Sequence, residues 1–423
     1  MRRAIRALAA TVGVLVLASQ VAGAQVLFWS TQAKPVEETQ RMRDIVLAEF
    51  EGGVDYQPSD DGPWLTRIQA ELQAGTGTIG LLGGLHGSFA SMPDDLVDLS
   101  GIDLGGQSVN QAYLELATLG TAEQKYLPWM QATYIMAANK KALEFLPEGA
   151  DINALTYDQL VAWSKALAEE TGSPKFGFPA GPEGLKHRFF QGFLLPSYAK
   201  SMVTKFRSPE AEAGWNMFRE LWQYTNPAST GYAFMQQPLL TEEVWIAFDH
   251  VARLADAFNQ KPDDFIAFPA PAGPAGRGFM PVVAGIAIPR TAPDMEASQA
   301  LVRYMMQPET QIATLRATNF FPVLADVTLP DDMPTSVKMS GPAIALMTGA
   351  PDAVPALLPI GLGDLGGKFN QVYTDTFERI ILGGQDVRGV LDDQAQVLKG
   401  LIDEAQAACW APDAPSDGPC PVE

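Results

Sequence analysis

The chain has 423 residues, of which 47% are hydrophobic, so it is long enough to form two buried cores rather than one. Its 49 aspartates and glutamates outnumber its 29 lysines and arginines, which gives a formal net charge of −20. Such acidity excludes nucleic acid and anionic membrane surfaces as partners.

The N-terminus has the pattern of a secretory signal peptide. Three arginines precede a short apolar run over residues 7–17, and Ala22 and Ala24 supply the small residues of a cleavage site. The run is shorter than the about 20 residues that span a bilayer, and no cysteine near the cut could carry a lipid. We therefore expect cleavage after Ala24 and a soluble periplasmic protein that begins at Gln25. A buried N-terminal helix is the alternative.

The first part of the mature chain alternates between strand and helix patterns. Short apolar runs predict strands at residues 26–29, 54–56 and 79–85. Apolar residues at helical spacing predict a helix over 37–50 and a second helix that starts at Pro63. This order is typical of a mostly parallel sheet with helices on both faces.

The rest of the chain is richer in helix. Lobe crossings are expected near Pro128 and Pro281. The predicted elements are helices over 156–168, 210–224 and around 254–258, a buried strand within 281–289, a helix over 299–306, and a long helical stretch over 373–408 that Gly383-Gly384 breaks.

The two cysteines, Cys409 and Cys420, lie near the C-terminus. In an exported chain we expect them to form a disulfide. The loop that it closes is short, so the bond should contribute about 2–3 kcal/mol. A redox role is the alternative, although there is no C-x-x-C.

Catalytic signals are poor. The three histidines do not have metal-ligand spacing, and there is no G-x-S-x-G motif. Residues 361–366 match the dinucleotide pattern G-x-G-x-x-G, but Pro355 and Pro359 disrupt the strand that should precede it, so a flexible turn before a helix near Phe369 is the preferred interpretation. We expect no cofactor, no metal and no catalytic residues. A glycosidase pair could lie among the many carboxylates, but no spacing selects one.

Polar and aromatic residues follow the first three predicted strands. Open α/β sheets bind ligands at this edge, so these residues are ligand candidates. Each has a structural alternative as a turn, loop or helix-capping residue. They are Trp29, Ser30 and Gln32 after the first strand, Asp61 after the second, and His86 after the third.

The run over residues 245–253 combines an apolar strand pattern with polar side chains at its end. Trp245 offers an apolar face to a sugar ring, and Asp249, His250 and Arg253 can hydrogen-bond a polyhydroxyl ligand. Asp249 could instead cap the helix that follows.

Several segments together resemble the carbohydrate-binding class of extracellular solute-binding proteins that serve ABC importers, the maltose-binding-like group. The resemblance covers nearly the whole mature chain. Two departures are Glu242, where the family usually has glycine, and Ala138, where it usually has tyrosine. The segments that carry it are 127–134 with 138–143, 155–160, 243–245, 268–274 with 283–289, and 319–323.

The resemblance implies a two-lobed α/β fold whose lobes are each a mostly parallel sheet flanked by helices. The N-terminal lobe would comprise residues 25–130 and 283–325, and the C-terminal lobe 131–282 and 326–423. A carbohydrate would bind between the lobes, and the closed, monomeric protein would dock on an ABC importer permease. Trp129, Gln131 and Phe321, which lie within the resembling segments, complete the expected ligand set.

Other functions remain open from the sequence alone. An exported glycosidase or lyase is one. A surface adhesion module is another. Within the binding class, glycerol phosphate would need a cationic pocket, for which Arg253 with Lys186 or Arg188 is available, and a polyamine would need several carboxylates.

Overall fold

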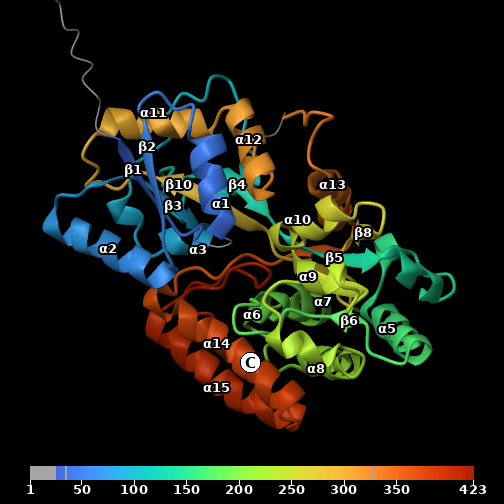
Figure 1. The fold of residues 1–423 in the computed structure, drawn as a ribbon. Helices are drawn as coiled ribbons and strands as arrows, with labels where there is room; N and C mark the ends of the chain where they lie inside the picture. Colours follow the sequence, from blue (N-terminus) through green and yellow to red (C-terminus); the bar gives the residue numbers. More distant parts are fainter. Residues whose placement is uncertain (1–24, 34–35, 325–326) are drawn as a thin grey trace, which may run out of the picture.

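The computed structural model describes residues 25–33, 36–324 and 327–423. The expected signal peptide and its cleavage site lie outside the described residues. Two separate sheets, each with its own helices, form the two lobes (Figure 1). Within the described part of the chain no helix is long and apolar enough to cross a membrane.

The N-terminal lobe is built on a five-stranded sheet. Helices α11 and α12, which come late in the sequence, pack against this sheet or its helices and so return the chain to the first lobe (Figure 1). The strand order is β2 (Val54–Pro58), β1 (Val26–Ser30), β3 (Ile79–Leu85), β10 (Val282–Ala287), β4 (Leu127–Ala132). The helices are α1 (Val36–Arg41), a π-helical turn (Met42–Val46), α2 (Asp61–Ala74), α3 (His86–Phe89), α4 (Gln111–Leu116), α11 (Met295–Met305) and α12 (Pro308–Thr318).

The C-terminal lobe is built on a four-stranded sheet. Its order is β6 (Phe176–Gly177), β7 (Ile246–His250), β5 (Tyr134–Asn139), β8 (Phe265–Phe268). A two-stranded ribbon joins β9 (Arg277–Phe279) to β11 (Ala353–Pro355). The helices are α5 (Tyr157–Thr171), α6 (Lys186–Phe189), α7 (Leu195–Ala199), α8 (Pro209–Trp222), α9 (Gln236–Leu240), α10 (Val251–Gln260), α13 (Thr335–Thr348), α14 (Gly366–Phe377) and α15 (Val387–Ala405).

The two-lobed α/β fold is confirmed, but each sheet is mixed rather than simply parallel. Strand β10 is antiparallel to both β3 and β4, and β5 is antiparallel to both β7 and β8. The reason is topological. In each lobe, the strand that enters from the other lobe runs against its neighbours, whereas the remaining strands run toward the interface. The carboxyl ends of β1, β2, β3 and β7 therefore face the space between the lobes.

The chain crosses between the sheets at two described places. Strand β4 ends at Ala132 and β5 begins at Tyr134, so Thr133 makes the first crossing. The second lies between β9 and β10, and the Thr133 hydroxyl donates to the carbonyl of Met280 there over 2.8 Å. The expected third crossing, at residues 325–326, lies outside the described residues.

The expected disulfide is confirmed and holds the C-terminal tail on the second lobe. Cys409 and Cys420 are bonded, with their Cα atoms 4.6 Å apart. The tail's backbone continues along the loop before α8, where the amide of Glu423 donates to the carbonyl of Thr204 over 3.1 Å. The last residues are therefore part of the folded lobe.

A buried glutamate in the N-terminal lobe makes stability depend on pH. Glu38 is 2% exposed, and its Oε1 has no hydrogen-bond partner in the described chain. Burial raises the pKa of Glu38 to about 8, although Arg41 opposes the rise. The native state therefore holds a proton that the unfolded state has already lost, and stability must fall as pH rises from about 4.5 toward 8.

We expect Glu38→Gln to flatten this dependence. Two other buried groups change the stability only at lower pH. Burial lowers the pKa of His86 to about 4, so its effect is confined to pH values below the usual histidine pKa. The pKa of Asp249 is about 6, so its effect is confined to pH values below about 6. Between pH 6.5 and 8, wild type should lose about 1.5 kcal/mol relative to Glu38→Gln. Urea unfolding at several pH values measures the difference. Glu37→Gln, an exposed neighbour on α1, is the control, and parallel profiles for wild type and Glu38→Gln would contradict the account.

Candidate functional site

A cavity of about 540 Å³ lies between the two lobes. Ligand cavities commonly have volumes of this order. Helix α2 and the turn after β3 form one wall, and Arg188 with the segment leading into α14 forms the other. Its lining includes Asp61, Trp64, Gln69, Leu85, Gly87, Ser88, Arg188, Leu358, Asp364 and Asn370.

Asp61 brings a carboxylate to the N-terminal wall of this cavity. It is the first residue of α2, and Asp60 occupies the helix-capping position without a side-chain cap bond. The capping role that the sequence left open for Asp61 is therefore not the one observed. Its side chain faces the cavity. The surrounding protein partly desolvates the carboxyl group and so raises its pKa, whereas the charge of Arg188 opposes the rise. Asp61 is placed to accept hydrogen bonds from a ligand.

Arg188 brings a guanidinium to the opposite wall. It lies on α6, and its Nη1 atom is fully buried with no hydrogen-bond partner among the described residues. The Nε2 atom of His187 beside it is likewise buried and without a partner. Burial lowers the pKa of Arg188, whereas Tyr134 and Asp61 oppose this. The cavity thus has a carboxylate on one lobe facing a guanidinium on the other.

The lobes approach each other closely at one edge of the cavity. Gly87 belongs to α3 in the N-terminal lobe, and a Cβ atom built on it would lie 2.4 Å from the carbonyl oxygen of Pro359 in the other lobe. Only a residue without a side chain allows this approach. Gly87 therefore permits this close contact between the lobes.

The glycine-rich segment at residues 361–367 forms much of the C-terminal wall. Its Leu362, Gly363, Asp364, Gly366 and Gly367 line the cavity. The dinucleotide pattern is, as preferred from the sequence, a turn before a helix, with Gly363 at φ 48°. The sequence pattern alone did not indicate that this turn lines a binding site. Its density of glycines was the available signal, because glycine lets a ligand reach the backbone.

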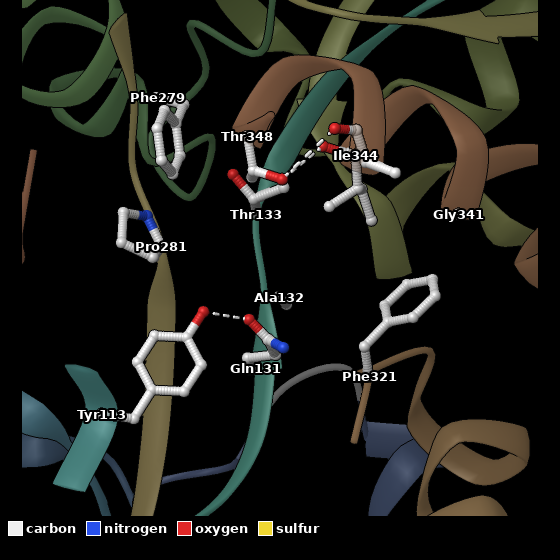
Figure 2. A pocket seen from close by; sticks show the side chains of 11 residues that line it. Tyr113, Gln131, Ala132, Thr133, Phe279, Pro281, Phe321, Gly341, Ile344 and Thr348 are labelled. Atoms are coloured by element: carbon white, nitrogen blue, oxygen red, sulfur yellow. Dashed lines mark hydrogen bonds between the residues drawn. The ribbon is translucent and has the colours of Figure 1, made fainter. Parts of the chain in front are cut away.

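A second, smaller cavity of about 220 Å³ lies where the chain crosses between the lobes. Figure 2 shows Phe279 and Pro281 on one side of it and Phe321 and Ile344 on the other. Its walls are mainly apolar, and the Tyr113 hydroxyl within it already donates to the Gln131 Oε1 atom. It offers a solute fewer unsatisfied polar groups than the larger cavity does.

The residues predicted as ligand contacts at the end of β1 do not line the larger cavity. Trp29 and Trp64 exchange hydrogen bonds, each indole donating to the other's carbonyl over 3.2 Å, and Arg67 stacks 4.5 Å from the Trp29 ring. Ser30 is fully buried and accepts a bond from the amide of Gln32. Of these residues only Trp64 lines the cavity.

His86 lies next to cavity-lining residues but is itself 3% exposed. Its Nδ1 lies 2.7 Å from the Tyr126 hydroxyl, and its Nε2 is buried without a partner. Burial lowers the pKa of His86 to about 4, so the ring is neutral at neutral pH. The structure places it as a neutral group behind the cavity wall.

Three other expected ligand residues lie away from the larger cavity. Trp129 is 1% exposed and packs edge-on against Phe28, so it belongs to the core. Gln131 and Phe321 line the second cavity, where their backbones exchange two hydrogen bonds of 2.9 and 2.6 Å. These residues hold the lobe crossing together.

The strand end at residues 249–253 is near the interface, but its side chains have internal partners. Asp249 is fully buried and accepts bonds from the amides of Met235 and His250 over 2.8 and 2.7 Å. The cap of α10 is His250, one residue later than expected, because its Nδ1 accepts from the amide of Ala252. Arg253 donates to two carbonyls and stacks 4.5 Å from the Phe234 ring.

Trp245 lies at the far end of β7 from the interface. It precedes the strand, whose carboxyl end at His250 faces the other lobe. A strand of this length spans about 16 Å. The Lys175 ammonium lies 5.5 Å from the centre of its ring. The structure therefore does not bring Trp245 together with Asp61 and Arg188.

No group of three or more potential metal ligands occurs among the residues that the structure describes. The polar groups at the larger cavity suit hydrogen bonding to an organic solute. They come from both lobes, so a solute bound there would contact both.

A two-lobed fold with a polar cavity between the lobes defines the class of solute-binding proteins. The family model for bacterial extracellular solute-binding proteins matches residues 52–341, and the chain belongs to that family. Members of this family act outside the cytoplasm as binding proteins. A search of curated proteins finds no match.

Solved structures share the fold. The GacH receptor of Streptomyces glaucescens, known unliganded and with acarbose, has a TM-score of 0.69 and 16% identity over 89% of this chain and 98% of that one. UgpB from Mycobacterium tuberculosis, in complex with glycerophosphocholine, has a TM-score of 0.70 and 18% identity over 90% and 98%. Maltose-bound MalE3 of T. maritima has a TM-score of 0.67 and 16% identity over 89% and 99%.

Proposed function

We propose that the protein captures a sugar or sugar-like polyhydroxyl solute between its lobes and delivers it to the membrane permease of an ABC importer. It acts as an exported, periplasmic monomer that begins at Gln25 and has no catalytic turnover. The lobes close over the solute, and the closed form docks on the permease.

One observation carries this proposal. The cavity of about 540 Å³ places the Asp61 carboxylate of one lobe opposite the Arg188 guanidinium of the other. Hydroxyl groups can donate to the first and accept from the second, so one polyhydroxyl molecule would link the lobes. The bound acarbose, maltose and glycerophosphocholine of the similar structures support a solute with several oxygens.

An exported carbohydrate-active enzyme is the second candidate. Two carboxylates, Asp61 and Asp364, line the same cavity, and glycosidases use such a pair. The enzyme class would release product steadily, whereas a binding protein returns its solute unchanged.

A thermal-shift screen of the mature protein against sugars, polyols and phosphorylated polyols tests the proposal. At least one compound should raise the melting temperature, and calorimetry should then give micromolar or tighter binding, about −8 kcal/mol. Chromatography of the mixture after several hours should recover the compound intact. Steady product formation would support the enzyme instead.

A methyl group at the closest approach of the lobes should hinder closure. In Gly87→Ala the new Cβ would meet the Pro359 carbonyl, and the simplest relief is to open the lobes. X-ray scattering of the ligand mixture should give a larger radius of gyration for Gly87→Ala than for wild type, with weaker binding. Gly62→Ala is the matched control, since its Cβ meets nothing within 4 Å although Gly62 also lines the cavity. Equal radii for the two variants would contradict the closure model.

A further inference from the structure

The arginine at the cavity differs from the arginines that form ion pairs in the described part of the chain. Six of them have a carboxylate within 4.0 Å: Arg67, Arg207, Arg290, Arg316, Arg379 and Arg388. Arg188 has no such ion pair among the described residues, although carboxylates greatly outnumber cations in this protein. A buried guanidinium without an anion is costly unless something compensates its charge.

The Asp61 carboxylate acts on Arg188 from across the cavity but does not come within 4.0 Å of it, and the other groups around Arg188 supply no anion. From its own helix it has His187 and Lys186, and from α10 it has Arg253. Burial and these neighbours lower the pKa of His187, so its ring is neutral. The Tyr134 hydroxyl lies near both arginines, and burial raises the pKa of this tyrosine, so it too is uncharged at neutral pH.

The neighbouring cations are already bonded. The Lys186 ammonium donates to the carbonyl of Ala180 over 3.2 Å and lies 4.0 Å from the Glu378 carboxylate. Arg253 donates to two backbone carbonyls. The Nη1 atom of Arg188 is therefore the buried cationic donor in this group that is available to a ligand. The positive charges around it favour an anion at this place.

The geometry points to a solute that carries an anionic group, a phosphate or a carboxylate, bound by Arg188 in the cavity between the lobes. This inference rests on the proposed function and narrows its solute class. A guanidinium presents parallel N–H donors that match both anions, and such charge-assisted bonds are stronger than neutral ones.

Asp61 fixes the rest of the solute's chemistry. It faces the same cavity from the other lobe and would repel an anion placed beside it. The anionic group must therefore lie at Arg188, and hydroxyl or ammonium donors must lie at Asp61. A phosphorylated polyol, a phosphodiester of glycerol or a sugar acid meets both conditions, whereas a neutral sugar leaves Arg188 without an anion in direct contact.

Matched pairs of charged and neutral probes test the inference by calorimetry. The pairs are glycerol 3-phosphate with glycerol, glucose 6-phosphate with glucose, and glucuronate with its methyl ester, and inorganic phosphate is added as the bare anion. Wild type should bind at least one charged probe more tightly than its neutral partner. Binding of phosphate probes alone would identify the group as phosphate, and binding of glucuronate alone would identify it as carboxylate.

Arg188→Gln should then weaken binding of the charged probe about 10- to 150-fold while leaving any neutral binding unchanged. Arg303→Gln, an exposed arginine on α11, is the control. If Arg188→Gln does not fold, Arg188→Lys replaces it. Lysine keeps the positive charge but lacks the parallel N–H donors of the guanidinium, so the preference for the charged probe should fall by less.

Equal losses for charged and neutral probes would overturn the inference, and so would the absence of any Arg188-dependent anion binding. If a neutral sugar still binds in that case, the proposed function stands and only the inference fails. If no compound of either kind binds, both fail.

Discussion

Asp61→Ala should weaken solute binding about 10- to 150-fold. The Asp61 carboxylate faces the cavity and does not cap its helix, because Asp60 occupies the capping position. A hydrogen bond to a charged group contributes about 1.5–3 kcal/mol, and the solute's donors would lose it in a closed, poorly hydrated space. The melting temperature without solute should change little, since the variant loses only the interaction of Asp61 with Arg188 across the cavity and no hydrogen bond or close ion pair among the described residues.

Asp60→Ala is the matched control for this effect. Asp60 is an exposed acid one residue away, and it makes no side-chain cap bond. Calorimetric titration of the two variants with the solute found by thermal shift separates a local role from a general loss of negative charge. Equal affinity of Asp61→Ala and wild type would remove Asp61 from the site.

Asp413→Ala should lower the free energy of unfolding by about 3 kcal/mol or more. Asp413 lies in the loop that the disulfide closes and is 4% exposed. Its carboxylate accepts bonds from the amides of Met202, Val203 and Thr204 over 2.8–2.9 Å, and from the hydroxyls of Ser201 and Thr204. Alanine would leave these donors buried without partners.

Chemical denaturation with the disulfide intact measures the loss. Asp386→Ala is the control, because exposed Asp386 accepts a single cap bond from Gly389 and should cost about 0.5–2 kcal/mol. A loss for Asp413→Ala no larger than that of the control would show that the tail does not depend on this carboxylate.

Local patterns predicted most of the elements. The continuous apolar run at 79–85 became β3 with the same bounds, since a buried central strand needs such a run. Thr156 and Gln159 form the capping box that begins α5. The single reversed strand in each sheet could not be predicted this way, because its direction depends on which lobe the chain comes from.

The resemblance also located a strained position. Glu242 stands where the family usually has glycine, and its backbone adopts φ 58°, in the left-handed region that favours glycine. Its carboxylate pairs with the Lys141 ammonium over 2.8 Å. Glu242 thus adopts this conformation although it carries a side chain.

The site was only partly predictable. The rule that ligands bind at the carboxyl ends of strands selected Asp61 correctly as a cavity residue. Trp245 was selected instead for its aromatic face, and it lies at the opposite end of its strand from the other lobe. The sequence indicated Arg188 only as one of several cations that could bind a phosphate. Nothing in its local pattern shows that it would face Asp61 across the two lobes.

A crystal structure of the mature protein with the solute found by the thermal-shift screen tests the central claim most directly. The account predicts solute density in the cavity between the lobes, with an anionic group at Arg188 and hydroxyl or ammonium donors at Asp61. Density in the smaller cavity beside Phe321, or on the outer surface of one lobe, would contradict it.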